Sequence, residues 1–269
     1  MAAAGAFRLI AGMRLRAFLS LPSLLLAFAL PAWAAEKIAI IKADDVRGLN
    51  GKWDRFIQVS QEHGANPSLG IILQSLEKPN PAYEEWLKKT AATGKVEFWN
   101  HGWDHKQWKE GELPKYEFKD SGYEHQKEAL AQSQAAALRV LGQPIVAFGA
   151  GFNAVDLDTA KALNETSELR LIFLYPGVPM SKALEGKVLI PMALAGENDG
   201  VGKPNFAKFK ETYAKRNNPQ LTLTALQFHP QMFSEQGFTD FAAIVDFMKA
   251  EGWTFILPSE YAKTLPPNR

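Results

Sequence analysis

A regular alternation of short apolar runs and amphipathic stretches is the strongest constraint that this sequence places on its fold. From Lys37 onward, apolar runs recur at intervals long enough for a helix to lie between them. Strands that alternate with helices form βαβ units and a parallel sheet. The expected strands are Lys37–Lys42, Ser68–Leu73, Val96–Trp99, Ile145–Phe148, Leu171–Tyr175, Val188–Ile190, Leu221–Phe228 and Thr254–Leu257.

The segments between these runs predict the helical layer. Pro81 in a first turn and Gly94 behind a last turn are typical start and stop signals. The polar stretch from Lys106 to Gly122 is expected to be a loop, either one that covers the substrate or a solvated connection. The expected helices are Lys52–His63, Pro81–Thr93, Tyr123–Leu141, Asp156–Leu163 and Phe238–Glu251.

These elements predict an α/β protein, a single-domain distorted (β/α) barrel of about seven strands. A doubly wound open sheet is the alternative. In either architecture the reactive groups belong at the carboxyl ends of the strands.

The first 34 residues have the composition of a secretory signal peptide. Three arginines and no acidic residue accompany the apolar run 17–30, and Ala32-Trp33-Ala34 is an A-x-A cleavage pattern. The run is shorter than the roughly 20 residues that span a bilayer, although an uncleaved anchor is the alternative. We therefore expect a mature chain of residues 35–269 that is periplasmic or secreted, with no stable membrane insertion after cleavage.

Composition narrows the possible chemistry. The chain has no cysteine, which excludes disulfides, thiol nucleophiles and cysteine-based metal sites. Any metal must be held by carboxylates and by some of the five histidines. The net charge is +1 with no strongly basic stripe, so nucleic acid is not an expected partner.

Three expected strands end in residues that carry chemistry. Asp44 and Asp45 follow the first strand, His101 and His105 follow the third, and His229 follows the strand from Leu221. A barrel brings these ends together on one face. Two imidazoles and one carboxylate suit a divalent cation and leave coordination positions open for water. Taken alone, two histidines four residues apart are more often structural, and paired aspartates more often form a cap or turn.

Several segments resemble the polysaccharide deacetylases of carbohydrate esterase family 4. Asp44-Asp45 after KIAIIKA is similar to that family's first motif, and the segment NHGWDH from Asn100 to His105 is similar to its second. Phe228-His229 resembles the late Leu-x-His motif, and FILPSEY (255–261) resembles the closing segment. The resemblance runs from Lys37 to Tyr261, so residues 35–269 are expected to form one deacetylase-like barrel domain.

The resemblance implies a metal-dependent hydrolase that removes acetyl groups, most often N-acetyl groups, from an oligo- or polysaccharide. Asp45, His101 and His105 would bind the divalent metal, usually zinc. Asp44 would be the general base that deprotonates the metal-bound water, and His229 the general acid that protonates the leaving nitrogen. An amide is a poor electrophile with a poor leaving group, so its hydrolysis needs all three kinds of help.

The chain also departs from the family pattern. The third motif, Arg-x-Pro-x-Gly, supplies an arginine that pairs with the catalytic aspartate, but residues 147–153 read AFGAGFN with no arginine. Asp199 and Asp240 are the candidate acidic partners of His229. Substrate contacts are expected at Trp103, Trp108, Phe152 and Asn153.

Two other functions stay open at this level. One is a catalytically weak or inactive relative that binds glycan, which the missing arginine favours. The other is a metal-dependent hydrolase of another amide or ester. The five residues at the strand ends favour the deacetylase.

Overall fold

The computed structural model describes residues 36–216 and 218–265, which belong to one compact unit. The expected signal peptide lies outside the described residues. Within the described part of the chain, no helix combines the length and the apolar character that crossing a membrane requires.

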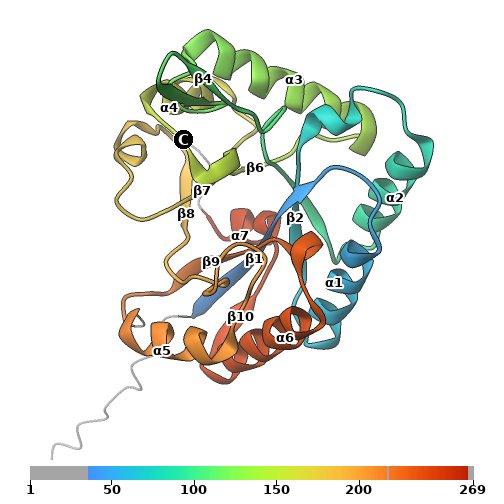
Figure 1. The fold of residues 1–269 in the computed structure, drawn as a ribbon, viewed down its shortest axis with the longest axis vertical. Helices are drawn as coiled ribbons and strands as arrows, with labels where there is room; N and C mark the ends of the chain where they lie inside the picture. Colours follow the sequence, from blue (N-terminus) through green and yellow to red (C-terminus); the bar gives the residue numbers. More distant parts are fainter. Residues whose placement is uncertain (1–35, 217, 266–269) are drawn as a thin grey trace, which may run out of the picture. The chain divides into compact units, whose positions relative to one another are not determined.

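Eight parallel strands form the central sheet (Figure 1). From β9, the hydrogen-bonded order runs β9-β1-β2-β3-β6-β7-β8, and β10 pairs with the first residues of β1. The bounds are β1 Lys37–Val46, β2 Pro67–Ile71, β3 Glu97–Asn100, β6 Ala147–Phe148, β7 Leu171–Leu174, β8 Val188–Pro191, β9 Leu223–Phe228 and β10 Trp253–Phe255.

The first and last strands of this series approach each other. β8 and β9 lie side by side, and the Ala193 N–H donates to Thr224 Oγ1 over 3.2 Å. The series of seven strands from β9 to β8 is therefore a nearly closed, distorted barrel, as the sequence predicts. The doubly wound open sheet is wrong.

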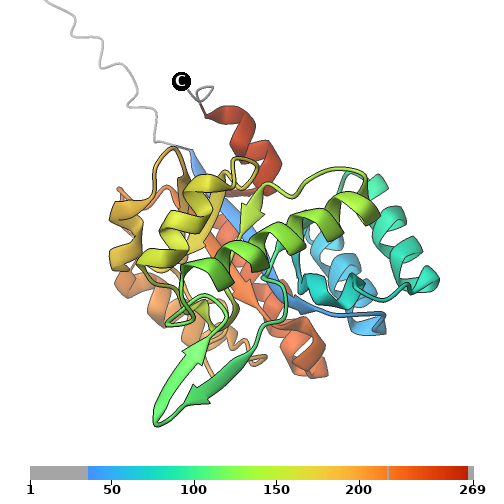
Figure 2. The ribbon, with the colours of Figure 1, turned by 90° about the horizontal axis from the view of Figure 1, so that it is seen from above.

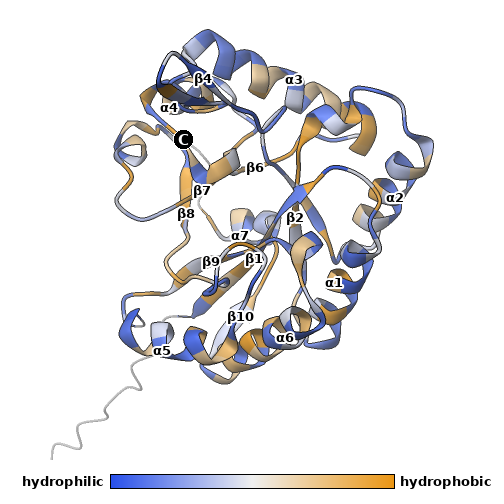
Figure 3. Ribbon diagram, in the orientation of Figure 1, coloured by the Kyte–Doolittle hydropathy of each residue, from blue (hydrophilic) through white to orange (hydrophobic). Residues whose placement is uncertain are grey.

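Helices surround the strands (Figure 1). They carry both hydrophilic and hydrophobic residues (Figure 3), and the hydrophobic ones include buried core residues such as Trp53 and Phe56 of the first helix. Two of the helices, α5 and α7, are missing from the sequence prediction because each is short and rich in polar residues. The bounds are α1 Gly51–Glu62, α2 Pro81–Ala92, α3 Tyr123–Leu141, α4 Leu157–Glu165, α5 Phe206–Arg216, α6 Glu235–Ala250 and α7 Pro258–Thr264.

The polar stretch 106–122, expected to be a loop, contains an antiparallel hairpin. Strands β4 (Gln107–Glu110) and β5 (Leu113–Tyr116) pair with each other and project from the barrel (Figure 2). The hairpin turns at Gly111, whose φ of 63° is easily reached by glycine. Its residues are mostly exposed, so the sequence lacks the alternation of apolar and polar residues that predicts a half-buried strand.

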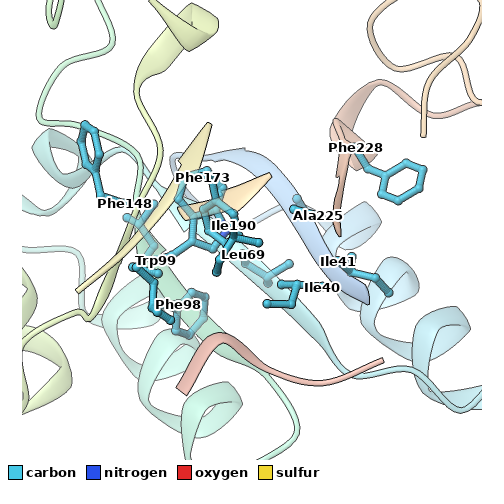
Figure 4. Close-up of a cluster of buried hydrophobic side chains, with 14 of the residues drawn as sticks. Ile40, Ile41, Leu69, Phe98, Trp99, Phe148, Phe173, Ile190, Ala225 and Phe228 are labelled. Atoms are coloured by element: carbon cyan, nitrogen blue, oxygen red, sulfur yellow. The ribbon is translucent and has the colours of Figure 1, made fainter. Parts of the chain in front are cut away.

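The buried side chains form two layers, one inside the barrel and one between the sheet and its helices. Trp99 and Phe173 meet inside the barrel, with ring centroids 5.3 Å apart. Phe228 points away from them (Figure 4) and packs on Phe56 of α1 and Phe241 of α6. Side chains alternate across a strand, so one strand supplies both layers.

Candidate metal centre and its catalytic neighbours

The five predicted residues at strand ends meet at one end of the barrel. Asp44 and Asp45 lie near the carboxyl end of strand β1, and His101 follows β3 directly. His229 follows β9, and His105 comes from the loop after His101. Asp45, His101 and His105 each offer one ligand atom, and the three atoms lie within 4.8 Å of one another.

The distances within this cluster fit a metal ion. Asp45 Oδ1 is 3.3 Å from His101 Nε2 and 3.4 Å from His105 Nε2. Two atoms bound tetrahedrally at about 2.0–2.1 Å lie roughly that far apart. Asp45 Oδ1 is also buried without a hydrogen-bond partner, which is costly unless something else satisfies it. The donor set therefore fits a divalent cation.

The neighbours of these ligands hold them in place. His101 Nδ1 lies 2.7 Å from the Gly149 carbonyl oxygen, to which a protonated Nδ1 donates, so that Nε2 keeps its lone pair. Asp45 Oδ2 accepts from Gln231 Nε2 over 3.1 Å. A Cβ at Gly151 would lie 2.5 Å from the His105 ring, so only glycine fits there without displacing that ring.

A buried glutamate supports the loop that carries His105. The Glu117 carboxylate accepts from the backbone N–H groups of Trp103, Asp104 and His105. Burial raises the pKa of Glu117 to about 7, although those three N–H donors act to lower it. The sequence offers no sign of this role, because Glu117 belongs to a polar stretch twelve residues beyond His105.

Backbone strain gathers around the cluster. Five non-glycine residues of the described chain have a positive φ, and four of them contact or form the site: Asp45, His105, Phe152 and Asn153. Such conformations cost on the order of 1–3 kcal/mol each and persist where the surroundings enforce them. Their concentration here marks a functional site.

Electrostatics keep the ligands ready for a cation. Burial acts to raise the pKa of Asp45, but the imidazoles close to it, His101 first, hold that pKa below its usual range. Burial, together with repulsion from His101, lowers the pKa of His105 to about 4. At neutral pH the site therefore presents a carboxylate and a neutral His105 imidazole, which are the protonation states that bind metal.

Asp44 lies beside the ligands but faces a different partner. Its carboxylate is almost fully buried, and Lys42 Nζ lies 2.7 Å from both of its oxygens. Its Oδ2 is 3.7 Å from His101 Nε2 and 3.8 Å from His229 Nε2. The sequence did not single out Lys42, since a lysine inside an apolar strand reads as a surface residue.

The acidic partner of His229 is Glu197. Its Oε2 lies 2.8 Å from His229 Nδ1, and its Oε1 accepts from the His229 backbone N–H. Burial lowers the pKa of His229, but the Glu197 hydrogen bond and the nearby Asp44 charge raise it overall.

The candidates Asp199 and Asp240 are wrong. Asp199 pairs with Lys208, and Asp240 lies on α6. The position of Glu197 just past β8 is the signal that would have found the correct residue.

The four predicted substrate residues separate into two groups. Phe152 is 49% exposed, its ring centroid is 4.4 Å from that of His105, and Asn153 donates to Gln227. Trp108 lies on the hairpin against His125, and Trp103 is half-buried against the core. Phe152 thus adjoins the metal ligands, whereas the two tryptophans lie on the hairpin side, where Trp103 lines a small cavity with Glu117 and His125.

An open cleft of about 510 Å³ begins at Asp45, one of the three candidate ligands. Asp45 lines it, and the Asp45 side chain is 20% exposed. The ligand cluster is therefore reachable from solvent. The other lining residues are Arg47, Gly48, Leu49, Asn50, Trp53, Gln231 and Met232.

Comparisons with known proteins were made by sequence and by structure. No protein-family model matches the sequence, and no curated protein matches it either. Similar solved structures exist. The esterase family 4 domain of a multidomain xylanase, from the hindgut metagenome of Trinervitermes trinervoides, has a TM-score of 0.59 at 14% identity; the match covers 87% of this chain and 94% of that one.

Two further structures extend this picture. A family 4 acetyl xylan esterase from Clostridium thermocellum, in complex with a cobalt ion, has a TM-score of 0.57 at 13% identity, over 86% of this chain and 93% of that one. A family 4 pseudoenzyme from Bacillus anthracis has a TM-score of 0.59 at 10% identity, over 84% and 66%. The resemblance seen in the sequence is thus confirmed for the fold, and the chain has the fold of carbohydrate esterase family 4.

Proposed function

We propose that this protein is an exported, metal-dependent hydrolase that removes acetyl groups, chiefly N-acetyl groups, from a glycan. The observation that carries the proposal is the meeting of Asp45 Oδ1, which lacks any hydrogen-bond partner, with two imidazole Nε2 atoms beside Asp44 and His229. The shared fold supports it, because the similar structures include esterases and deacetylases of acetylated polysaccharides.

Asp45, His101 and His105 would hold the cation, which we propose to be zinc. A divalent cation bound there polarises a carbonyl oxygen and lowers the pKa of water toward ~7. Asp44 is the carboxylate next to the ligands that is not one of them, and in this proposal it accepts a proton from the attacking water.

His229 completes the proposed reaction. Glu197 occupies its Nδ1, which leaves the Nε2 N–H of the protonated ring directed toward Asp44 and the ligands. Despite burial, the hydrogen bond to Glu197 and the charge of Asp44 raise the pKa of His229, which favours the protonated ring. It can therefore donate that proton to the departing nitrogen, which turns a poor leaving group into an amine.

Metal analysis together with an acetate assay tests this proposal. Purified protein is expected to contain about one zinc per chain and to release acetate from chitin-type oligomers or peptidoglycan. Removal of the metal by a chelator should abolish release, and added Zn²⁺ should restore it. Full turnover by metal-free protein would contradict the mechanism.

A specific observation favours a second candidate, a catalytically inactive relative that binds glycan. The structure is as similar to a pseudoenzyme as to an esterase, with a TM-score of 0.59 for each, and residues 147–153 lack the arginine of the family pattern. Zinc binding and glycan binding without acetate release from any acetylated sugar would identify this function.

A further inference from the structure

A lysine inside the barrel forms a tight ion pair with the proposed base. Lys42 is fully buried, and its Nζ is 2.7 Å from both oxygens of Asp44. The same Nζ lies 4.5 Å from the centre of the Trp99 ring, which adds a cation–π contact. Both ends of this ion pair are therefore held from several sides.

Stability does not explain such a pair. Two charges inside a protein lose their hydration, and replacing a buried ion pair with apolar residues of similar volume is often neutral or stabilising. The chain nevertheless makes room for it. A Cβ at Gly149 would lie 3.0 Å from Lys42 Cε, and one at Gly70 would lie 2.3 Å from the Trp99 ring. The space for Lys42 and its aromatic partner thus depends on two glycines.

We propose that Lys42 is the positioning residue that orients the Asp44 carboxylate and balances its charge beside Asp45. It would do from β1 what an arginine after β6 does in the family pattern. Contact with both oxygens fixes the plane of the carboxylate, and the positive charge offsets the repulsion between two adjacent aspartates. This inference rests on the proposed function, because it assumes that Asp44 acts as the base.

Replacing Lys42 tests the inference in the full-length zinc-loaded protein. Lys42→Met keeps the length of the side chain and removes the charge. We expect kcat to fall about 100-fold or more, the lower part of the range that general base catalysis contributes, with KM and zinc content unchanged. Lys187→Met is the matched control and should leave kcat unchanged. Lys187 is a half-buried lysine just before β8, and it donates to the Thr166 carbonyl oxygen.

A second variant covers the possibility that methionine disturbs the interior. Lys42→Ala leaves a space beside Asp44 that a small alkylammonium ion fits, so ethylammonium should restore part of kcat while ethanol should not. Wild-type kcat in Lys42→Met, or a loss of kcat that follows a loss of zinc and does not respond to ethylammonium, would overturn the inference. Wild-type protein that binds zinc and releases no acetate would overturn the proposed function and this inference together.

The cleft beside the metal ligands carries an independent inference about the substrate. Arg47 lines it next to Asp45 and is exposed, and within the described residues it makes no ion pair or side-chain hydrogen bond. Leu49 and Met232, each more than half exposed, give the cleft apolar walls.

With a divalent cation bound, Arg47 would lie beside a positively charged centre, and an anion in the cleft would offset the repulsion between them. We infer that this cleft binds the sugar next to the one being deacetylated and that Arg47 binds a carboxylate on that sugar. The apolar walls suit the faces of a sugar ring, and a guanidinium pairs with a carboxylate through two parallel hydrogen bonds. The preferred substrate would then be an acetylated glycan that contains acidic sugars. This also rests on the proposed function.

Two matched substrates test the role of Arg47. An acetylated oligosaccharide with carboxylate-bearing sugars is compared with the same oligosaccharide after reduction of its carboxyl groups to alcohols. In Arg47→Gln we expect KM for the acidic substrate to rise about tenfold, as expected for a lost hydrogen bond to a charged group, and KM for the reduced substrate to stay unchanged.

Lys95→Gln is the control, because Lys95 is an exposed cation beyond the opposite end of β3. Equal effects of Arg47→Gln on both substrates, or no effect on either, would overturn the inference about the cleft. Acetate release by the wild-type protein would still support the proposed function in that case.

Discussion

The two ends of the barrel both have a cavity with a carboxyl group shielded from solvent, but only at one end do several titratable side chains converge on it. At the amino end of β3, a cavity of about 460 Å³ is lined by Glu97 and by Leu257 and Ser259 at the start of α7. Glu97 accepts from the Ser259 N–H, and burial raises its pKa. No histidine lines this cavity, so Glu97 has one backbone partner and nothing to act on.

The carboxyl ends of the strands differ in how many groups converge. There, Asp45 faces two imidazoles, and Asp44 faces a lysine and a third imidazole. Parallel strands direct their following loops to the same end, which brings distant segments together. A buried, perturbed carboxyl group is thus a weak sign of function, whereas several titratable groups around one unsatisfied oxygen are a strong one.

The largest difference between the two ends should appear when a proposed ligand is removed. Asp45→Ala or His101→Ala should abolish zinc binding and acetate release, because either change leaves only two ligands. The loss of affinity should exceed the ~10–100-fold that loss of an outer partner costs. Zinc content by mass spectrometry and acetate release measure the effect. Glu97→Ala at the other end of the barrel is the control. An equal loss of zinc and of acetate release in that variant would contradict the difference between the two ends.

Separating chemistry from metal binding sharpens the comparison further. Asp44→Asn should retain zinc and lower kcat roughly 10²–10⁴-fold, the usual contribution of a general base. The measurement is steady-state kinetics on the zinc-loaded variant below its melting temperature, since the change leaves Lys42 without its charged partner. A variant with wild-type kcat would show that Asp44 is not the base.

A smaller effect is expected from the partner of His229, and it depends on pH. Glu197 holds the pKa of His229 above its ordinary value of 6.5, and the proposed acid works only when protonated. Glu197→Gln should therefore lower that pKa, so that kcat begins to fall at a lower pH on the alkaline side, by about one unit for ~1.4 kcal/mol of lost interaction. A kcat–pH profile identical to that of the wild type would contradict the pairing.

The smallest effect concerns Glu97, and it should appear in stability alone. Its pKa is raised in the folded state, so its contribution is favourable below the ordinary value of 4.5 and is lost as pH rises through the folded-state value. Glu97→Gln should therefore become more stable relative to wild type as pH increases from 4 to 8, with kcat unchanged. Urea unfolding at several pH values measures it, and a constant difference would show that Glu97 does not titrate as proposed.

The sequence by itself determined the fold class and pointed to the candidate metal ligands. Apolar runs alternating with amphipathic segments predicted the parallel barrel, because burial on both faces leaves a continuous apolar signature in each strand. Asp45, His101 and His105 were recognisable because they directly follow such strands. The hairpin β4–β5 was not predicted, since exposed strands lack that signature, and β6 keeps only two of its four expected residues.

Only the tertiary structure decided which groups surround the ligands. Glu197, Glu117 and Lys42 come from a loop after β8, from the end of the hairpin and from the middle of β1. Glu197 and Glu117 contact partners more than ten residues away, whereas Lys42 and Asp44 are two residues apart on β1 and only the folded barrel buries their pair. Local patterns report burial and periodicity, whereas a side chain's partner depends on how strands and loops pack in three dimensions.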